Sequence, residues 1–166
     1  MSYPRTFLNI GDLFVCGPEN IVITNLGSCV ALGLVWKRKG LFSLCHCLLP
    51  EPIHDTVKLS NHGPAKYVTL AVPLMLKEMG VPRRQYRDLE AHVFGGAQQY
   101  KVMEVERNVG QLNINALLQA LAFYQIPIVE TDVGGQVCRQ VHLNTTTGTF
   151  DVKKPEQSGG QVWKAN

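Results

Sequence analysis

The sequence predicts an α+β fold, in which mixed and largely antiparallel β-sheets pack together and two main helices flank them. Short apolar or β-branched runs separated by turn residues fill the first half of the chain, as is typical of strands. Two segments, 64–79 and 108–124, instead repeat apolar residues at helical spacing. The paired runs 29–49 and 137–153 each enclose a short polar turn, which favours antiparallel hairpins.

The length and composition predict a single domain. Its 166 residues match the size of one domain, so we expect residues 1–154 to form the fold and residues 155–166 to be a flexible tail. With 45% hydrophobic and 17% charged residues, the composition is that of a soluble globular protein. No apolar stretch reaches the roughly 18 residues of a membrane-spanning helix. We therefore expect no membrane insertion, and the N-terminal residues suggest no secretory signal.

Charge and cysteine usage limit the partners and the compartment. The net charge of +3 is mild and the basic residues are scattered, whereas nucleic-acid binders usually gather them on one face. We therefore expect no nucleic-acid partner. The five cysteines form an odd set without a regular framework, which favours free thiols in a reducing cytoplasm.

The first half of the chain is predicted to be β-structure. Short strands are expected at 12–16 and 20–24. The run 29–36 is almost wholly apolar, as expected for a strand covered on both faces. The polar residues 37–40 then form a turn, and 41–49 is the returning strand.

The first helix is predicted to open at Pro64, after a loop at 51–63, and to stop before Gly80. Leu70 is expected on its apolar side. Pro73 lies inside the helical pattern, and because proline removes a backbone donor and clashes with the preceding turn, it should kink or split the helix.

The second half mixes strands with one helix. That helix is expected to be capped by Asn108 and to end at Tyr124, with Leu118 on its buried face. The expected strands and closing hairpin are 89–94, 126–133, 137–143 and 149–153.

One segment carries the clearest chemical signal. In the run from Thr24 to Cys29, a thiol directly follows a Gly-Ser turn at the mouth of the predicted buried strand. A tight turn can expose a nucleophile while nearby backbone N–H groups stabilise an oxyanion. Because a free thiol has a pKa of about 8.5, it needs a base at neutral pH. Cys29 is therefore the candidate nucleophile, and His46 on the returning strand is the candidate base.

The hairpin is expected to bring these two side chains together. Residues equidistant from an antiparallel turn lie opposite each other, and a turn centred between Lys37 and Arg38 places Cys29 opposite His46. Directly opposed Cβ atoms are about 4.5–5.5 Å apart. The alternative is that Cys29 is a small buried residue and His46 a core or edge histidine. The residues alone leave both interpretations open.

No metal or cofactor site is predicted. Alternate residues of a strand point to opposite faces, so Cys45, His46 and Cys47 cannot converge on one ion, and both cysteines should pack in the core. Gly95-Gly96 and Gly134-Gly135 are interpreted as ordinary strand-ending turns, since neither fits a phosphate-binding motif. The remaining histidines are interpreted as loop or surface residues: His54, His62, His92 and His142.

The block from Leu26 to Ala31 (LGSCVA), followed by His46 and Leu49-Pro50, resembles the chemoreceptor glutamine deamidases of the CheD family. Further motifs follow in the order of that family, so the resemblance covers about residues 8–153: Phe94-Gly95-Gly96-Ala97, Arg107-Asn108, Asp132-Val133-Gly134-Gly135 with Arg139, and Thr147-Gly148. The resemblance implies a cytoplasmic enzyme, without metal or organic cofactor, that converts receptor glutamines to glutamate and releases ammonia. It also implies a fold similar to the cytotoxic-necrotizing-factor deamidase toxins.

The same resemblance implies roles for individual residues. Cys29 matches the nucleophile, His46 the base and Thr24 the third group of a Cys–His–Thr arrangement. In some relatives the third group lies one residue further from the cysteine, where this chain has Ile23. The implied substrates are the cytoplasmic domains of chemoreceptors, and some members also bind a CheC-type phosphatase. Two alternatives stay open: a non-catalytic adaptor that engages receptors or a phosphatase, and Cys–His chemistry on another amide, such as a transamidation.

Overall fold

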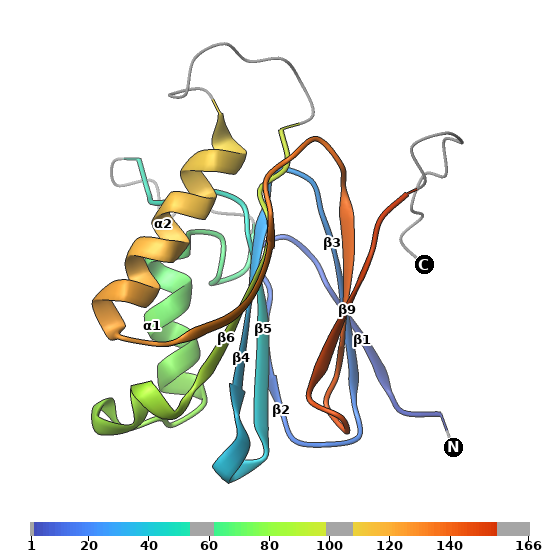
Figure 1. Ribbon diagram of the computed structural model, residues 1–166, viewed down its shortest axis with the longest axis vertical. Coiled ribbons are helices and arrows are strands. Elements are labelled where there is room, and N and C mark those ends of the chain that lie inside the picture. The colour runs from blue at the N-terminus through green and yellow to red at the C-terminus, as the bar shows by residue number, and fades with distance from the viewer. Residues whose placement is uncertain (1, 54–61, 99–107, 156–166) are drawn as a thin grey trace.

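The computed structural model describes residues 2–53, 62–98 and 108–155 (Figure 1). The predictions for His54, for Arg107 and for the tail from residue 156 onward lie outside the described residues.

Two sheets form the core of the fold. Five strands make the larger sheet, in the order β2 (Leu13–Cys16), β5 (Leu41–Cys47), β4 (Val30–Trp36), β6 (Glu90–Gly95) and β7 (Ile128–Val133). Four strands make the smaller sheet, in the order β1 (Arg5–Leu8), β3 (Ile21–Leu26), β8 (Arg139–Asn144) and β9 (Thr149–Lys153). All neighbours pair antiparallel except β1 with β3 and β6 with β7. The predicted α+β fold with mixed, largely antiparallel sheets is confirmed.

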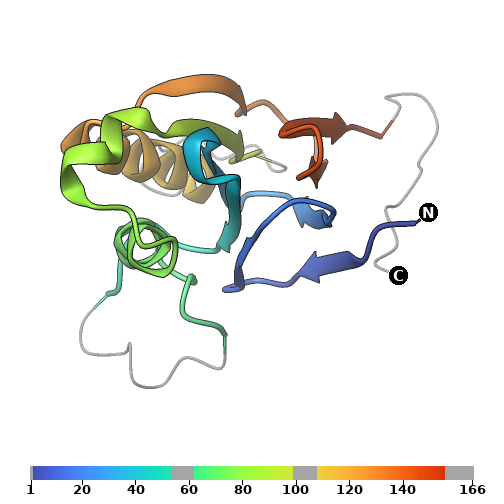
Figure 2. The same cartoon turned by 90° about the horizontal axis from the view of Figure 1, so that it is seen from below.

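The elements are stacked in three layers (Figure 1). The helices α1 (Val68–Glu78) and α2 (Val109–Tyr124) cover one face of the larger sheet, and the smaller sheet covers the other. Seen from below in Figure 2, both helices lie on the side away from β1 and β9. Every residue of β4 is buried, as predicted for a strand covered on both faces. Within the described ranges, no helix is long and apolar enough to cross a membrane.

The first helix differs from its prediction. It starts at Val68 rather than at Pro64, and Pro73 lies inside it without splitting it. Because Pro73 has no N–H, the carbonyl of Thr69 lacks its usual helical donor. Thr69 is exposed, so water can take the place of that donor. Leu70 is 40% exposed, so its placement on the apolar side is wrong. The buried stripe has the i, i+3, i+4, i+7, i+8 spacing instead, at Val68, Ala71, Val72, Met75 and Leu76.

The second helix follows its prediction at both ends. The Asn108 side chain accepts a hydrogen bond from the backbone N–H of Gln111 at 3.0 Å, and the helix ends at Tyr124. The expected burial of Leu118 is wrong, because this side chain is 37% exposed. A polar residue, Asn113, is fully buried on the inner face of the helix instead.

Candidate active site

The β4–β5 hairpin brings the predicted nucleophile and base to one region, with a register that differs from the expected one. Ala31, not Cys29, lies opposite His46. The turn includes Gly40, whose left-handed backbone (φ 57°) closes the helical turn at Lys37–Lys39. The turn spans residues 37–40, as predicted, but the pairing is centred between Arg38 and Lys39, one residue beyond the assumed centre, so the direct opposition of Cys29 and His46 is wrong.

Cys29 is instead a diagonal neighbour of His46 on the same face of the sheet. It lies one residue ahead of β4 and shares the apolar cluster between the two sheets with Ala31. Diagonal neighbours have Cα atoms on the order of 7–8 Å apart and remain within reach of long side chains. Within the described part of the chain, the Nε2 atom of His46 has no hydrogen-bond partner, so no such bond joins it to the Cys29 sulfur.

Thr24 and His46 connect the two sheets. The Oγ1 atom of Thr24, on β3, lies 2.7 Å from the Nδ1 atom of His46, on β5. The Thr24 hydroxyl donates to the Leu8 carbonyl at 3.0 Å, so it accepts from an Nδ1–H. This contact assigns the imidazole proton to Nδ1 and leaves the lone pair on Nε2. Ile23, the alternative third residue, is a buried apolar side chain.

Burial favours the neutral forms of both candidate groups, Cys29 and His46. Desolvation lowers the pKa of His46 to about 4, although the Asp12 carboxylate and the Leu8 carbonyl act in the opposite direction. Desolvation also raises the pKa of Cys29 to about 11, against a smaller lowering by its own backbone N–H. At neutral pH the pair is therefore a thiol and a neutral imidazole rather than a preformed thiolate–imidazolium pair.

The two glycines at the end of β6, Gly95 and Gly96, hold the backbone that carries Cys29. The N–H of Gly96 donates to the Cys29 carbonyl at 2.8 Å, and the N–H of Ala97 donates to the Gly27 carbonyl at 2.9 Å. Gly95 has a φ of +100°, and a Cβ atom there would lie 2.3 Å from the Cys29 carbonyl oxygen. These glycines therefore hold residues 27–29, the turn that carries the candidate nucleophile (the nucleophile turn), a role that their interpretation as ordinary turns misses.

In the described part of the chain, the other histidines and cysteines do not gather into a second site. Cys45 and Cys47 pack in the helix-side core, as predicted, with their sulfur atoms 3.7 Å apart. His92 is buried rather than on the surface, because its Nδ1 atom pairs with a Glu130 oxygen at 2.7 Å and its ring stacks on Phe150. Among the residues that the structure describes, no three His, Cys, Asp or Glu side chains gather as a metal site requires.

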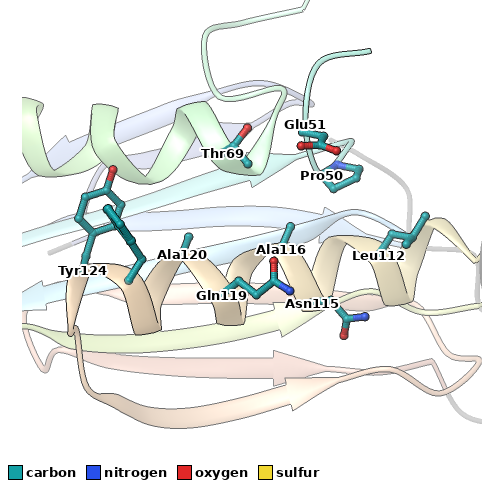
Figure 3. A pocket seen from close by; sticks show the side chains of 10 residues that line it. Pro50, Glu51, Thr69, Leu112, Asn115, Ala116, Gln119, Ala120 and Tyr124 are labelled. Atoms are coloured by element: carbon teal, nitrogen blue, oxygen red, sulfur yellow. The ribbon is translucent and has the colours of Figure 1, made fainter.

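A separate groove lies on the helical layer (Figure 3). It has a volume of about 600 Å³ and runs along the outer side of α2, from Pro50 and Leu112 to Phe123 and Tyr124. Neither the candidate nucleophile nor the candidate base lines it. The groove is therefore distinct from the Cys29–His46 region, which lies on the opposite face of the larger sheet.

Comparisons with known proteins agree with the resemblance. A family model described as CheD chemotactic sensory transduction matches residues 48–154. A relative from Bdellovibrio bacteriovorus, named probable chemoreceptor glutamine deamidase CheD, is 35% identical over 152 residues, 89% of this chain and 92% of the relative. A relative of the same name from Pyrococcus abyssi is 35% identical over 159 residues, 93% of each chain. A solved Neisseria meningitidis protein of the DUF152 family covers 81% of this chain and 65% of its own, with a TM-score of 0.49 and 12% identity.

Proposed function

This chain belongs to the CheD family, and from that membership and the site geometry we propose that it is a cysteine-dependent protein-glutamine deamidase. Its substrates are glutamine side chains on the cytoplasmic domains of chemoreceptors, and its products are glutamate and ammonia. The observation that carries this proposal is the 2.7 Å contact between Thr24 and His46. It leaves the lone pair on the Nε2 atom of His46, a diagonal neighbour of Cys29 on the same face of the larger sheet.

The reaction starts from the neutral pair. His46 Nε2 takes the proton of Cys29 as the sulfur attacks the carbon of the glutamine side-chain amide. The tetrahedral intermediate carries its negative charge on oxygen, and the backbone N–H of Cys29, which lies against the sulfur, is a donor for it. His46 then protonates the departing ammonia. Water, activated by the same nitrogen, hydrolyses the thioester to glutamate and restores the thiol.

Thr24 acts in this scheme as a positioning residue. Its hydroxyl holds the Nδ1–H of His46, so the same tautomer is present in each turnover. When His46 accepts a proton on Nε2, the Thr24 oxygen also stabilises the resulting imidazolium. No step of this scheme requires a metal or an organic cofactor.

The compartment and the regulatory partner are parts of the same proposal. All five cysteines are free thiols, which is consistent with the reducing cytoplasm where receptor signalling domains would be met. A CheC-type phosphatase is the proposed binding partner, on the basis of the family resemblance alone.

Replacement of the nucleophile tests the proposal. Cys29→Ala and Cys29→Ser should abolish ammonia release from a purified chemoreceptor cytoplasmic fragment. They should also abolish the 1 Da mass increase of the modified receptor peptide. Cys138→Ala is the matched control and should retain the activity of the wild type. Undiminished turnover by the Cys29→Ala protein would contradict the proposed mechanism.

A non-catalytic adaptor is the second candidate, and one observation favours it. Cys29 is only 7% exposed and burial raises its pKa to about 11, as expected for a structural thiol. An adaptor would bind the receptor fragment equally well as wild type and as Cys29→Ala, and neither protein would release ammonia. A transamidase would instead attach an added primary amine to the receptor glutamine, which mass spectrometry distinguishes from deamidation.

A further inference from the structure

Asn113 joins the two chain segments that carry the reacting side chains. Its side chain lies on the inner face of α2 and is fully buried. The Nδ2 atom donates to the Ser28 carbonyl at 3.1 Å and to the Leu48 carbonyl at 3.0 Å. Ser28 directly precedes the nucleophile, and Leu48 follows the base by two residues.

These two hydrogen bonds begin where the β4–β5 ladder ends. Val30 and Cys47 form the last paired positions of the hairpin. Beyond them, the Leu48 N–H donates to the Lys66 carbonyl instead. The backbone hydrogen bonds between the two segments therefore end at this point. The Asn113 amide replaces the missing ladder contact, because it holds one carbonyl from each segment.

The chemistry of the side chain explains why an amide occupies this buried position. Both contacts are to carbonyl oxygens, which require a donor, and an amide nitrogen carries two N–H groups. The opposite orientation would place Oδ1 against two carbonyls, so the orientation of the amide is set. The Oδ1 atom is buried and has no hydrogen-bond partner among the described residues. Since an unsatisfied buried acceptor is unfavourable, packing alone would favour an apolar residue here.

The helix that carries Asn113 is itself fixed against the nucleophile turn. Gly110, one turn earlier on α2, packs so closely that a Cβ atom there would lie 2.5 Å from the Gly96 carbonyl oxygen. Gly96 in turn donates to the Cys29 carbonyl. The distance from the helix to the turn is therefore set by backbone contact, and Asn113 has little freedom to adjust.

We propose that Asn113 is a positioning residue of the deamidase site, which sets the diagonal offset between Cys29 and His46 by holding the Ser28 and Leu48 carbonyls. This inference rests on the proposed function. Among the described residues, the hydrogen bonds of the Asn113 side chain go to these two carbonyls and not to the sulfur or the imidazole, so Asn113 acts through the backbone next to each of them.

The first test separates turnover from substrate binding. Asn113→Leu keeps a similar volume and removes both donors, and Asn113→Ser is a second variant in case the first folds poorly. Because misplacement by about 1 Å can cost roughly 100-fold in rate, each should lower kcat for ammonia release by about that factor. KM for the receptor fragment should stay within about twofold. Leu117→Ala, on the same buried face, controls for a loss of stability and should keep kcat.

The second test needs no receptor. The rate of iodoacetamide labelling at Cys29, read by mass spectrometry at pH 7, should fall in His46→Ala and in Asn113→Leu. The double variant should label no more slowly than the slower single variant, since Asn113 acts through the placement of His46 relative to the sulfur.

The two tests have distinguishable failures. If the wild type releases no ammonia, the proposed function fails, and the labelling rates alone then decide the role of Asn113. Three results overturn the positioning role: an unchanged kcat in both Asn113 variants of an active enzyme, additive labelling effects in the double variant, or no effect of His46→Ala on labelling.

Discussion

The Nδ1 atom of His46 lies 2.7 Å from the Oγ1 atom of Thr24, and this contact crosses from one sheet to the other. The Thr24 hydroxyl donates its one hydrogen to the Leu8 carbonyl on β1. Its role toward His46 is therefore limited to that of an acceptor. The packing of the two sheets thus determines which imidazole nitrogen carries the proton and which keeps its lone pair.

Thr24→Val tests this contact with little change of shape. Valine removes the acceptor of the Nδ1–H, so the tautomer with a free Nε2 is no longer favoured and the imidazolium loses its partner. Because positioned proton transfer contributes about 10²–10⁴-fold, kcat for ammonia release should fall by at least about 10²-fold. Thr24→Ser, which keeps the hydroxyl, should restore most of the activity. Equal activity of the valine and serine variants would show that the hydroxyl has no role in turnover.

The pH dependence of turnover should reveal a neutral resting pair. The active form needs a neutral His46, whose pKa is lowered to about 4, and a protonated Cys29, whose pKa is raised to about 11. Log kcat/KM should therefore be nearly flat from about pH 5 to about pH 10 and should fall below about pH 4. Initial rates of ammonia release give this profile. A narrow bell with limbs near pH 6 and pH 8 would indicate a preformed thiolate–imidazolium pair instead.

Folding stability should fall in mild acid because His46 is buried in its neutral form. The unfolded chain binds a proton at about the usual pKa of 6.5, whereas the folded chain does so only at about 4. The contribution of His46 to the free energy of unfolding is therefore fully present above pH 6.5. It decreases by about 3 kcal/mol as the pH falls from 6.5 to 4. Urea unfolding of the wild type and of His46→Gln over this range measures the effect.

The variant is needed because a second histidine contributes in the same direction. Desolvation, together with Lys153 and Arg5, also lowers the pKa of His142. Only the difference between the pH profiles of the wild type and of His46→Gln measures the contribution of His46. Parallel profiles for the wild type and His46→Gln would show that His46 titrates normally in the folded protein.

The sequence predicts those features that local pattern determines. The continuous apolar run of β4 indicates burial on both faces, and Asn108 caps its helix because a side-chain oxygen is available there. β1 is not predicted, since Leu8 is its one buried residue and the strand is held by backbone pairing with β3. Such a strand has no hydrophobic period of its own to detect.

The sequence indicates candidate site residues but not their geometry. Cys29 and His46 are indicated by a turn motif and a hairpin, yet a difference of one residue in the centre of the 37–40 turn shifts every cross-strand partner by two residues. Asn113 lies 65 residues from the carbonyl of Leu48 that it binds. In the helical pattern, Asn113 is only a polar residue on an otherwise apolar face. Its two carbonyl partners are set by tertiary packing and cannot be read from the sequence.

Gly95→Ala should reduce both activity and stability, because a Cβ atom at this position would lie 2.3 Å from the carbonyl oxygen of Cys29. The left-handed backbone (φ +100°) adds a strain of about 1–2 kcal/mol for a residue with a side chain. Gly80→Ala is the matched control, since Gly80 also has a positive φ (+67°) and a Cβ atom there would meet nothing within 4 Å.

The control variant should lose only the stability that backbone strain accounts for, and it should retain kcat. Gly95→Ala should lose more, because the Cys29 carbonyl must move and its hydrogen bond from Gly96 must weaken. Thermal unfolding and ammonia release, measured on both variants, separate the two contributions. If the two substitutions lower the melting temperature equally and both leave kcat intact, the glycines at the end of β6 do not hold the nucleophile turn.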